Sequence, residues 1–159
     1  CLSKGVNQAA QPILSINYGA GQMKRTDEVR RLTMIVSLII CGVIVAVGVL
    51  APDFFTYIFL NPDEEILSMS ADAVRTYFIG FLVMAANMVY ICYFQAIVKN
   101  GYALFLCLLR GCILVLIFVY ILPLFLGVWG IWLAFVAAEF FTLLIGIVCT
   151  KKGDRSRKV

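Results

Sequence analysis

Three long segments of this chain carry almost no charged residues. Residues 32–51 and 77–98 contain no Asp, Glu, Lys or Arg, and residues 103–150 contain only Arg110 and Glu139. About 20 helical residues cross the hydrocarbon core of a bilayer, so apolar runs of this length predict transmembrane helices. The runs are continuous rather than alternating, which favours helices over a membrane barrel. We therefore expect an all-α membrane protein, a polytopic helical bundle.

The composition agrees with this fold class and points away from catalysis. Hydrophobic residues make up 63% of the chain, against roughly half in a soluble domain. There is no histidine, and the six cysteines show no metal-ligand spacing. No P-loop or dinucleotide-binding motif is present. We therefore expect no enzyme, no metal site and no cofactor, and we interpret the cysteines as small packing residues.

Turn-forming and charged residues divide the chain into segments. Residues 1–23 predict the end of a truncated transmembrane helix followed by a glycine breaker, and residues 24–31 predict a cytoplasmic linker. Residues 32–150 predict four full transmembrane helices, at about 32–51, 73–98, 102–122 and 131–150. They are joined by an acidic loop at 53–72, a tight turn at 99–101 and a short connection after Pro123. Residues 151–159 predict a disordered basic tail. Because the chain starts at Cys1 without a visible signal peptide, we expect a piece of a longer polypeptide.

Basic residues lie in alternate connections. The linker has four, the turn after the second span has Lys99, and the tail has five, whereas the opposite side has only Arg75. Lys and Arg concentrate in cytoplasmic loops, so this asymmetry predicts four spans with a cytoplasmic C-terminus. The net charge of +4 is then a topology signal and not a nucleic-acid footprint. The expected location is the plasma membrane, the inner membrane of a bacterium.

Glu139 lies near the middle of the fourth predicted span. An ionisable side chain at that depth is costly and usually faces protein or water. Its helical neighbours include Thr142, Gly146 and two aromatic residues, a face that suits a cavity for an organic cation or a coupling ion. A carboxyl group in a low-dielectric site can exchange a proton near neutral pH. The other interpretation is a protonated Glu139 that bonds a neighbouring helix.

Other intramembrane polar residues are also candidates for substrate or ion binding. Arg110, in the third span, either extends its side chain toward the interface or pairs with a carboxylate inside the bundle. Asn87, Tyr90 and Gln95 share a polar and aromatic face of the second span, for which helix–helix hydrogen bonding is an equally good explanation. Gln11 and Asn17 belong to the polar segment at the start of the chain.

Four sequence elements resemble, in order, those of the multidrug and toxic compound extrusion (MATE) transporters. Residues 11–21, Gln-Pro-Ile-Leu-Ser-Ile-Asn-Tyr-Gly-Ala-Gly, resemble the family element QPIISYNYGA, which ends the eighth of twelve spans before a basic linker. Residues 94–97 with Lys99 resemble the end of the tenth span, although a glycine more usually precedes that lysine. Leu108-Leu109-Arg110-Gly111 through Leu122-Pro123 resembles the eleventh span, and 127–134 with Ala138-Glu139 resembles the twelfth.

The resemblance implies that this chain is most of a C-terminal lobe. In this family, two six-helix bundles face each other across a central cavity. They export cationic, amphipathic drugs by alternating access, driven by entry of H⁺ or Na⁺. The implied partners are small organic cations, the lipid bilayer and a missing N-terminal lobe, and the isolated chain is expected not to transport. Two alternatives stay open, a lipid-linked oligosaccharide flippase of the same superfamily and a non-transporting membrane assembly subunit.

Overall fold

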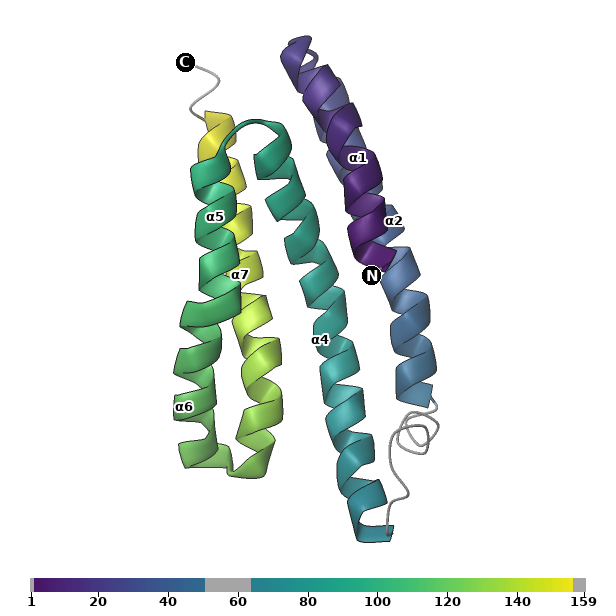
Figure 1. Cartoon of the computed structure of the whole chain (residues 1–159), viewed down its shortest axis with the longest axis vertical. Coiled ribbons are helices and arrows are strands. Elements are labelled where there is room, and N and C mark those ends of the chain that lie inside the picture. The colour runs from purple at the N-terminus through teal and green to yellow at the C-terminus, as the bar shows by residue number, and fades with distance from the viewer. Residues whose placement is uncertain (1, 51–63, 156–159) are drawn as a thin grey trace.

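The structure is a computed structural model that describes residues 2–50 and 64–155. Within those ranges all regular structure is helical, and the helices lie lengthwise beside one another in an elongated bundle (Figure 1). They are α1 (Leu2–Gly19), α2 (Met23–Leu50), α4 (Glu64–Ala96), α5 (Asn100–Leu108), the π-helix η1 (Leu109–Ile113), α6 (Leu114–Leu126) and α7 (Val128–Arg155). The predicted fold class is confirmed.

The predicted number of membrane-crossing helices is also confirmed for the described residues. Four segments are long and apolar enough to cross a bilayer: Met23–Leu50, Ala73–Ala96, Asn100–Leu126 and Val128–Lys151. The third of these consists of α5, η1 and α6 in one continuous helical run. Large apolar side chains such as Ile39, Leu116 and Phe125 are exposed on the bundle, as expected of a surface that contacts lipid.

Two helices extend further than the sequence predicts. Residues 24–31, predicted as a linker, form the first two turns of α2. No Gly or Pro interrupts them, and Arg30 Nη2 lies 3.2 Å from Asp27 Oδ1, three residues earlier on the helix surface. Pro123, predicted to end the third span, lies inside α6, which continues to Leu126.

Glycine ends α6 and allows the tight turn into α7. Gly127 has φ +57° and ψ −136°, a conformation that costs side-chain-bearing residues energy. Its N–H donates to the carbonyl oxygen of Pro123 at 2.9 Å. A Cβ atom at Gly130 would overlap the backbone of Leu122, so the close approach of α6 and α7 here requires glycine.

The other connections follow the sequence more closely. At the position of the predicted breaker, α1 ends at Gly19 and Gly21 has φ +70°. The turn predicted at 99–101 lies two residues earlier, at 97–99, where Val98 has φ +59°. Of the predicted acidic loop at 53–72, residues up to 63 lie outside the described residues and the rest is helical. The predicted tail is helical as far as Arg155, and its last four residues lie outside the described residues.

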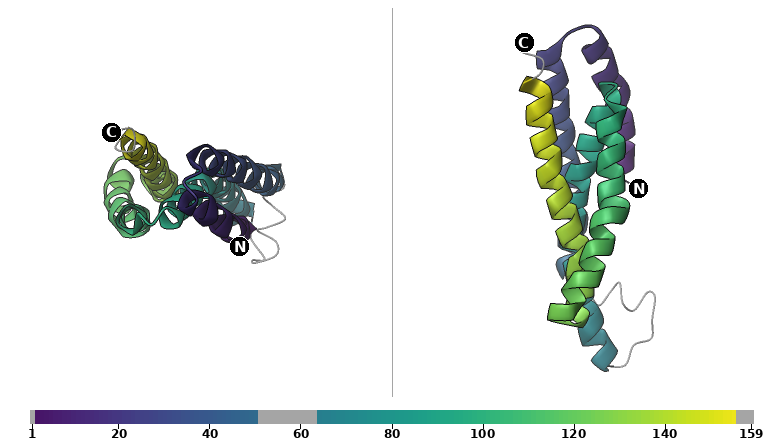
Figure 2. Two further views of the ribbon diagram at one scale, coloured as in Figure 1. Left: turned by 90° about the horizontal axis from the view of Figure 1, so that it is seen from above. Right: turned by 90° about the vertical axis from the view of Figure 1, so that its left-hand side faces the viewer.

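Three groups of basic residues lie toward one end of the bundle, at the start of α2, in the α4–α5 turn and at the end of α7. The α1–α2 turn, the α4–α5 turn and the C-terminal end of α7 all lie at the top in Figure 1, opposite the α6–α7 turn. The right-hand view of Figure 2 also has the α1–α2 turn and the end of α7 at the top and the α6–α7 turn toward the bottom. The predicted clustering of positive charge is therefore present in the fold, and its assignment to the cytoplasm remains a prediction.

Helix α4 is the central element and contacts α1, α2, α5 and α7. One buried apolar cluster joins α1, α4 and α5, with Leu14, Phe94 and Leu106 in its centre. Helix α2 buries a row of mostly small side chains, namely Thr26, Thr33, Ser37, Cys41, Val45 and Gly48. Small residues allow close helix approach in membrane proteins, and here the ring of Phe78 occupies the space that a Cβ at Gly48 would need.

Candidate functional site

A buried polar cluster joins α4, η1 and α7. Glu139 and Asn87 are each 2% exposed. Asn87 Nδ2 donates to Glu139 twice, to the carboxylate Oε2 at 2.7 Å and to the backbone carbonyl at 2.8 Å. On the other side, Arg110 Nη2 lies 2.8 Å from Glu139 Oε1. Both carboxylate oxygens therefore have a partner, and the charge of Glu139 is balanced inside the bundle.

The Arg110 guanidinium reaches this cluster from the π-helix η1. Arg110 is the eleventh residue of a span that begins at Asn100, which places it about 15 Å from that helix end at about 1.5 Å per residue. Its side chain is 16% exposed. Of the two interpretations of Arg110, the structure shows the pairing with a carboxylate inside the bundle and not the extension to the interface.

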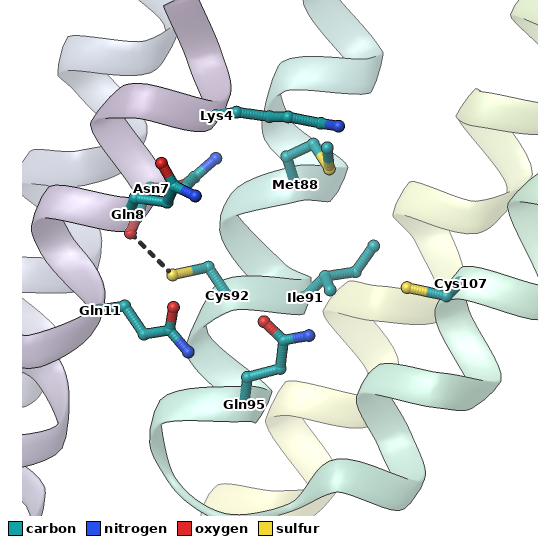
Figure 3. A pocket seen from close by; sticks show the side chains of 9 residues that line it. All are labelled: Lys4, Asn7, Gln8, Gln11, Met88, Ile91, Cys92, Gln95 and Cys107. Carbon is teal, nitrogen blue, oxygen red and sulfur yellow. Dashed lines mark hydrogen bonds between the residues drawn. The ribbon is translucent and has the colours of Figure 1, made fainter. Parts of the chain in front are cut away.

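A separate pocket of about 310 Å³ opens between α1, α4 and α5. Four carboxamide side chains contribute to its wall, and Figure 3 shows them on facing sides, from α1 and from α4. Met88 and Ile91 supply apolar surface, and Lys4 is its charged residue. The complete lining consists of Lys4, Asn7, Gln8, Gln11, Met88, Ile91, Cys92, Gln95 and Cys107. We call this site the amide pocket.

Local hydrogen bonds hold the α1 wall of the amide pocket against α4. Cys92 Sγ donates to the backbone carbonyl of Asn7 at 3.3 Å (Figure 3), and Asn7 Nδ2 donates to the carbonyl of Ser3 at 2.9 Å. The Ser3 hydroxyl lies 3.1 Å from Cys41 Sγ on α2. Cys92 and Cys41 thus pack as small residues with polar contacts, and no group of three or more potential metal ligands occurs in the described part of the chain.

The structure divides the predicted site residues among different places. Gln11 and Gln95 line the amide pocket, whereas Asn87, Arg110 and Glu139 form the buried cluster. Tyr90 packs at the α4–α7 interface, where its ring lies against Gly146, and Asn17 Nδ2 donates to the carbonyl of Ile13 within α1 at 2.8 Å. Glu139 is not among the residues that line the amide pocket.

Sequence reasoning missed several pocket residues and one helix irregularity. Lys4, Asn7 and Gln8 stand one and two turns before Gln11, and their polar repeat was a signal that could have placed them on the same wall. Cys107 has no comparable signal, because an isolated cysteine in an apolar run is usually a packing residue. The π-helix η1 leaves no trace in the hydrophobic pattern.

These observations define the chain as a polytopic helical membrane protein with polar sites inside its bundle. The model of the MatE family matches residues 1–121, which is most of the chain. The chain therefore belongs to the MatE family, that is, to the MATE transporters, which are transport proteins and not enzymes.

Solved structures of membrane transporters share this fold. The MATE multidrug transporter DinF-BH in complex with a drug is 31% identical, with a TM-score of 0.84 over 94% of this chain. A MOP superfamily transporter from Pyrococcus furiosus, for which reversed polarity of the binding pocket suggests a different function, is 19% identical, with a TM-score of 0.89 over 99% of this chain. An outward-facing multidrug resistance MATE transporter is also 19% identical, with a TM-score of 0.88 over 98% of this chain.

The chain spans about a third of these transporters, namely 33%, 36% and 35% of their respective lengths. The two matches at 19% identity support the fold alone. The comparison with curated proteins gave no match. The predicted family and membrane-spanning architecture are confirmed.

Proposed function

We propose that this chain is part of a secondary active transporter that exports organic cations and amphipathic drugs by alternating access, coupled to antiport of H⁺ or Na⁺. The observation that carries this proposal is the amide pocket between α1, α4 and α5, in a chain of the MATE family. Transporter sites of this kind lie between helices inside the membrane. The chain supplies one wall of the substrate path, and the N-terminal lobe of the same transporter supplies the other.

The chemistry of the amide pocket supports an amphipathic substrate. Carboxamide oxygens of Gln8, Gln11 and Gln95 accept hydrogen bonds from protonated amines, while their NH₂ groups donate to ethers and carbonyls. Met88 and Ile91 can contact the apolar body of such a molecule, and methionine adapts to different shapes. A mostly apolar wall with a few placed polar groups is the usual composition of a small-molecule site.

Glu139 is the proposed coupling-ion residue. It is the charged residue among the buried side chains of the described part of the chain, and a carboxylate can bind either H⁺ or Na⁺. Because Arg110 already neutralises it, an entering ion has to displace the guanidinium. The proposed location is the plasma membrane, with the basic end of the bundle in the cytoplasm, as the distribution of Lys and Arg supports.

Export kinetics test the role of the amide pocket. In the complete transporter reconstituted in vesicles, the double variant Gln11→Leu/Gln95→Leu removes two carboxamides from facing walls of the pocket. It should raise the KM for an organic cation about tenfold, because a tenfold change in KM corresponds to about 1.4 kcal/mol of lost hydrogen bonding. Asn17→Leu is the matched control, because Asn17 is a carboxamide on α1 outside the pocket. An unchanged KM in the double variant, or an equal rise in the control, would contradict the proposal.

A second candidate function is flipping of a lipid-linked oligosaccharide, and Lys4 is the observation that favours it. Lys4 is the charged residue of the amide pocket, no carboxylate lines the pocket, and lysine is a common phosphate ligand. The same export assay separates the two functions by substrate. Saturable export of organic cations supports the drug transporter, whereas translocation of a phosphate-bearing lipid without export of cations supports the flippase.

A further inference from the structure

The third membrane-crossing helix is irregular where it meets the ion pair. Residues Leu109–Ile113 form the π-helix η1, and the N–H of Leu114 donates to the carbonyl of Leu109, five residues earlier. A π-turn of this kind is a local bulge in an α-helix and holds one residue more than an α-helical turn. If α6 were extended toward the N-terminus as an uninterrupted α-helix, every residue of α5 would therefore be displaced by one position from where it lies in the structure.

Few contacts within η1 hold this irregular turn in place. Leu109 is its buried residue, whereas Gly111, Cys112 and Ile113 are exposed. Arg110 makes the ion pair of 2.8 Å with Glu139, and Asn87 and α7 fix Glu139 from the other side. Helices α6 and α7 share the most extensive helix–helix contact of the described bundle and lie side by side in Figure 1, so the half of the span after η1 is held independently of the ion pair.

The half of the span before η1 contributes one residue to the amide pocket. Cys107 is the residue of α5 in the pocket wall, and its thiol points from α5 toward Ile91 of α4 in Figure 3. Cys107 is also three residues before Arg110, less than one turn of helix. The residue that α5 presents to the pocket therefore depends on the register of η1.

We propose that Arg110 is a positioning residue whose ion pair with Glu139 holds the π-helical turn and thereby sets which residue of α5 lines the amide pocket. Without the pair, the turn relaxes to the ordinary α-helical geometry. Because α6 stays against α7, helix α5 has to absorb the extra residue. It moves by about 1.5 Å and rotates by about 100°, and residue 108 takes the place of residue 107.

Thiol accessibility in the complete transporter measures this register directly. Two single-cysteine versions are made, one that retains Cys107 and one that carries Leu108→Cys with Cys107→Ser. Labelling uses a small, water-soluble thiosulfonate reagent that reaches the pocket but not the lipid. With the ion pair intact, we expect position 107 to react at least tenfold faster than position 108.

The charge-free variant Arg110→Met/Glu139→Met should invert this ratio. It removes the pair without leaving a lone buried charge, which favours a folded protein. Two control variants distinguish a change in the register of α5 from a general disturbance of the structure. Asn87→Leu keeps the ion pair, so Cys107 should remain the faster thiol. Deletion of Gly111 in the charge-free variant removes the extra residue itself, so Cys107 should again be the faster thiol.

An unchanged preference for position 107 in the charge-free variant overturns the proposal. The same holds if Asn87→Leu inverts the preference as strongly, because the effect would then come from the packing around Glu139 and not from Arg110. Monodispersity of every variant in detergent is checked first, and if the charge-free variant does not fold, Arg110→Gln with Glu139→Gln replaces it. Labelling involves no substrate, so the result is independent of what the transporter exports.

Discussion

Truncation of either member of the buried ion pair to alanine should destabilise the protein by about 3–5 kcal/mol, because the remaining charge stays inside the bundle without its partner. Arg110→Ala leaves Glu139, which is 2% exposed, with Asn87 as its hydrogen-bond donor. Glu139→Ala leaves Arg110, whose side chain is 16% exposed, without its carboxylate partner. The free energy of unfolding is measured by denaturant titration in mild detergent micelles.

Two further variants show whether the loss comes from unpaired charge. The double variant Arg110→Met/Glu139→Met should recover most of the stability, since a hydrophobic pair of similar volume replaces the ion pair. Asp27→Ala removes a carboxylate from the ion pair with Arg30, in which Asp27 is 51% exposed, and should cost less than about 1 kcal/mol. Equal losses in the single and double variants would show that packing volume, and not charge, determines the stability here.

Glu139→Gln in the complete transporter should abolish the dependence of export on the pH or Na⁺ gradient. The amide cannot take up a proton near neutral pH or supply the negative charge that Na⁺ requires, but it keeps the size of the side chain and still accepts a hydrogen bond from Arg110. Uphill export should therefore fall to the background of empty vesicles. The measurement is accumulation of an organic cation under an imposed pH or Na⁺ gradient.

Asp27→Asn is the control for this second prediction, because Asp27 is an exposed carboxylate near the N-terminal end of α2 and should leave coupling intact. If Glu139→Gln retains the full gradient dependence, Glu139 is not the coupling residue. Its role is then limited to the structure that Asn87 and Arg110 form around it.

The four membrane-crossing helices could be predicted from the sequence because the thickness of a bilayer demands long apolar runs. In this chain the charged residues within those runs are Arg110 and Glu139. Helix ends were less predictable. Pro123 lies inside α6, a position that transmembrane helices tolerate more readily than soluble ones. Residues 24–31 are helical because nothing in them breaks a helix, although their charge suggested a connection.

The candidate site was predictable by residue type but not by partner. The positions of Arg110 and Glu139 within the apolar runs place them in different spans at similar depth. The sequence pattern cannot decide whether the two helices turn these side chains toward each other. For the same reason Gln11 and Gln95 were named without the pocket that joins them. The π-helix η1 depends on an ion pair between residues far apart in the sequence, so no local sequence pattern predicts it.

Substrate protection of Cys107 tests the central claim, that the amide pocket binds the exported molecule. Cys107 lines the pocket, whereas Cys112, five residues later in η1, is exposed outside it. In the detergent-solubilised complete transporter, a saturating organic cation should slow the reaction of Cys107 with N-ethylmaleimide at least fivefold and leave Cys112 unchanged. Equal reaction rates of Cys107 with and without a cation that the transporter exports would contradict the account.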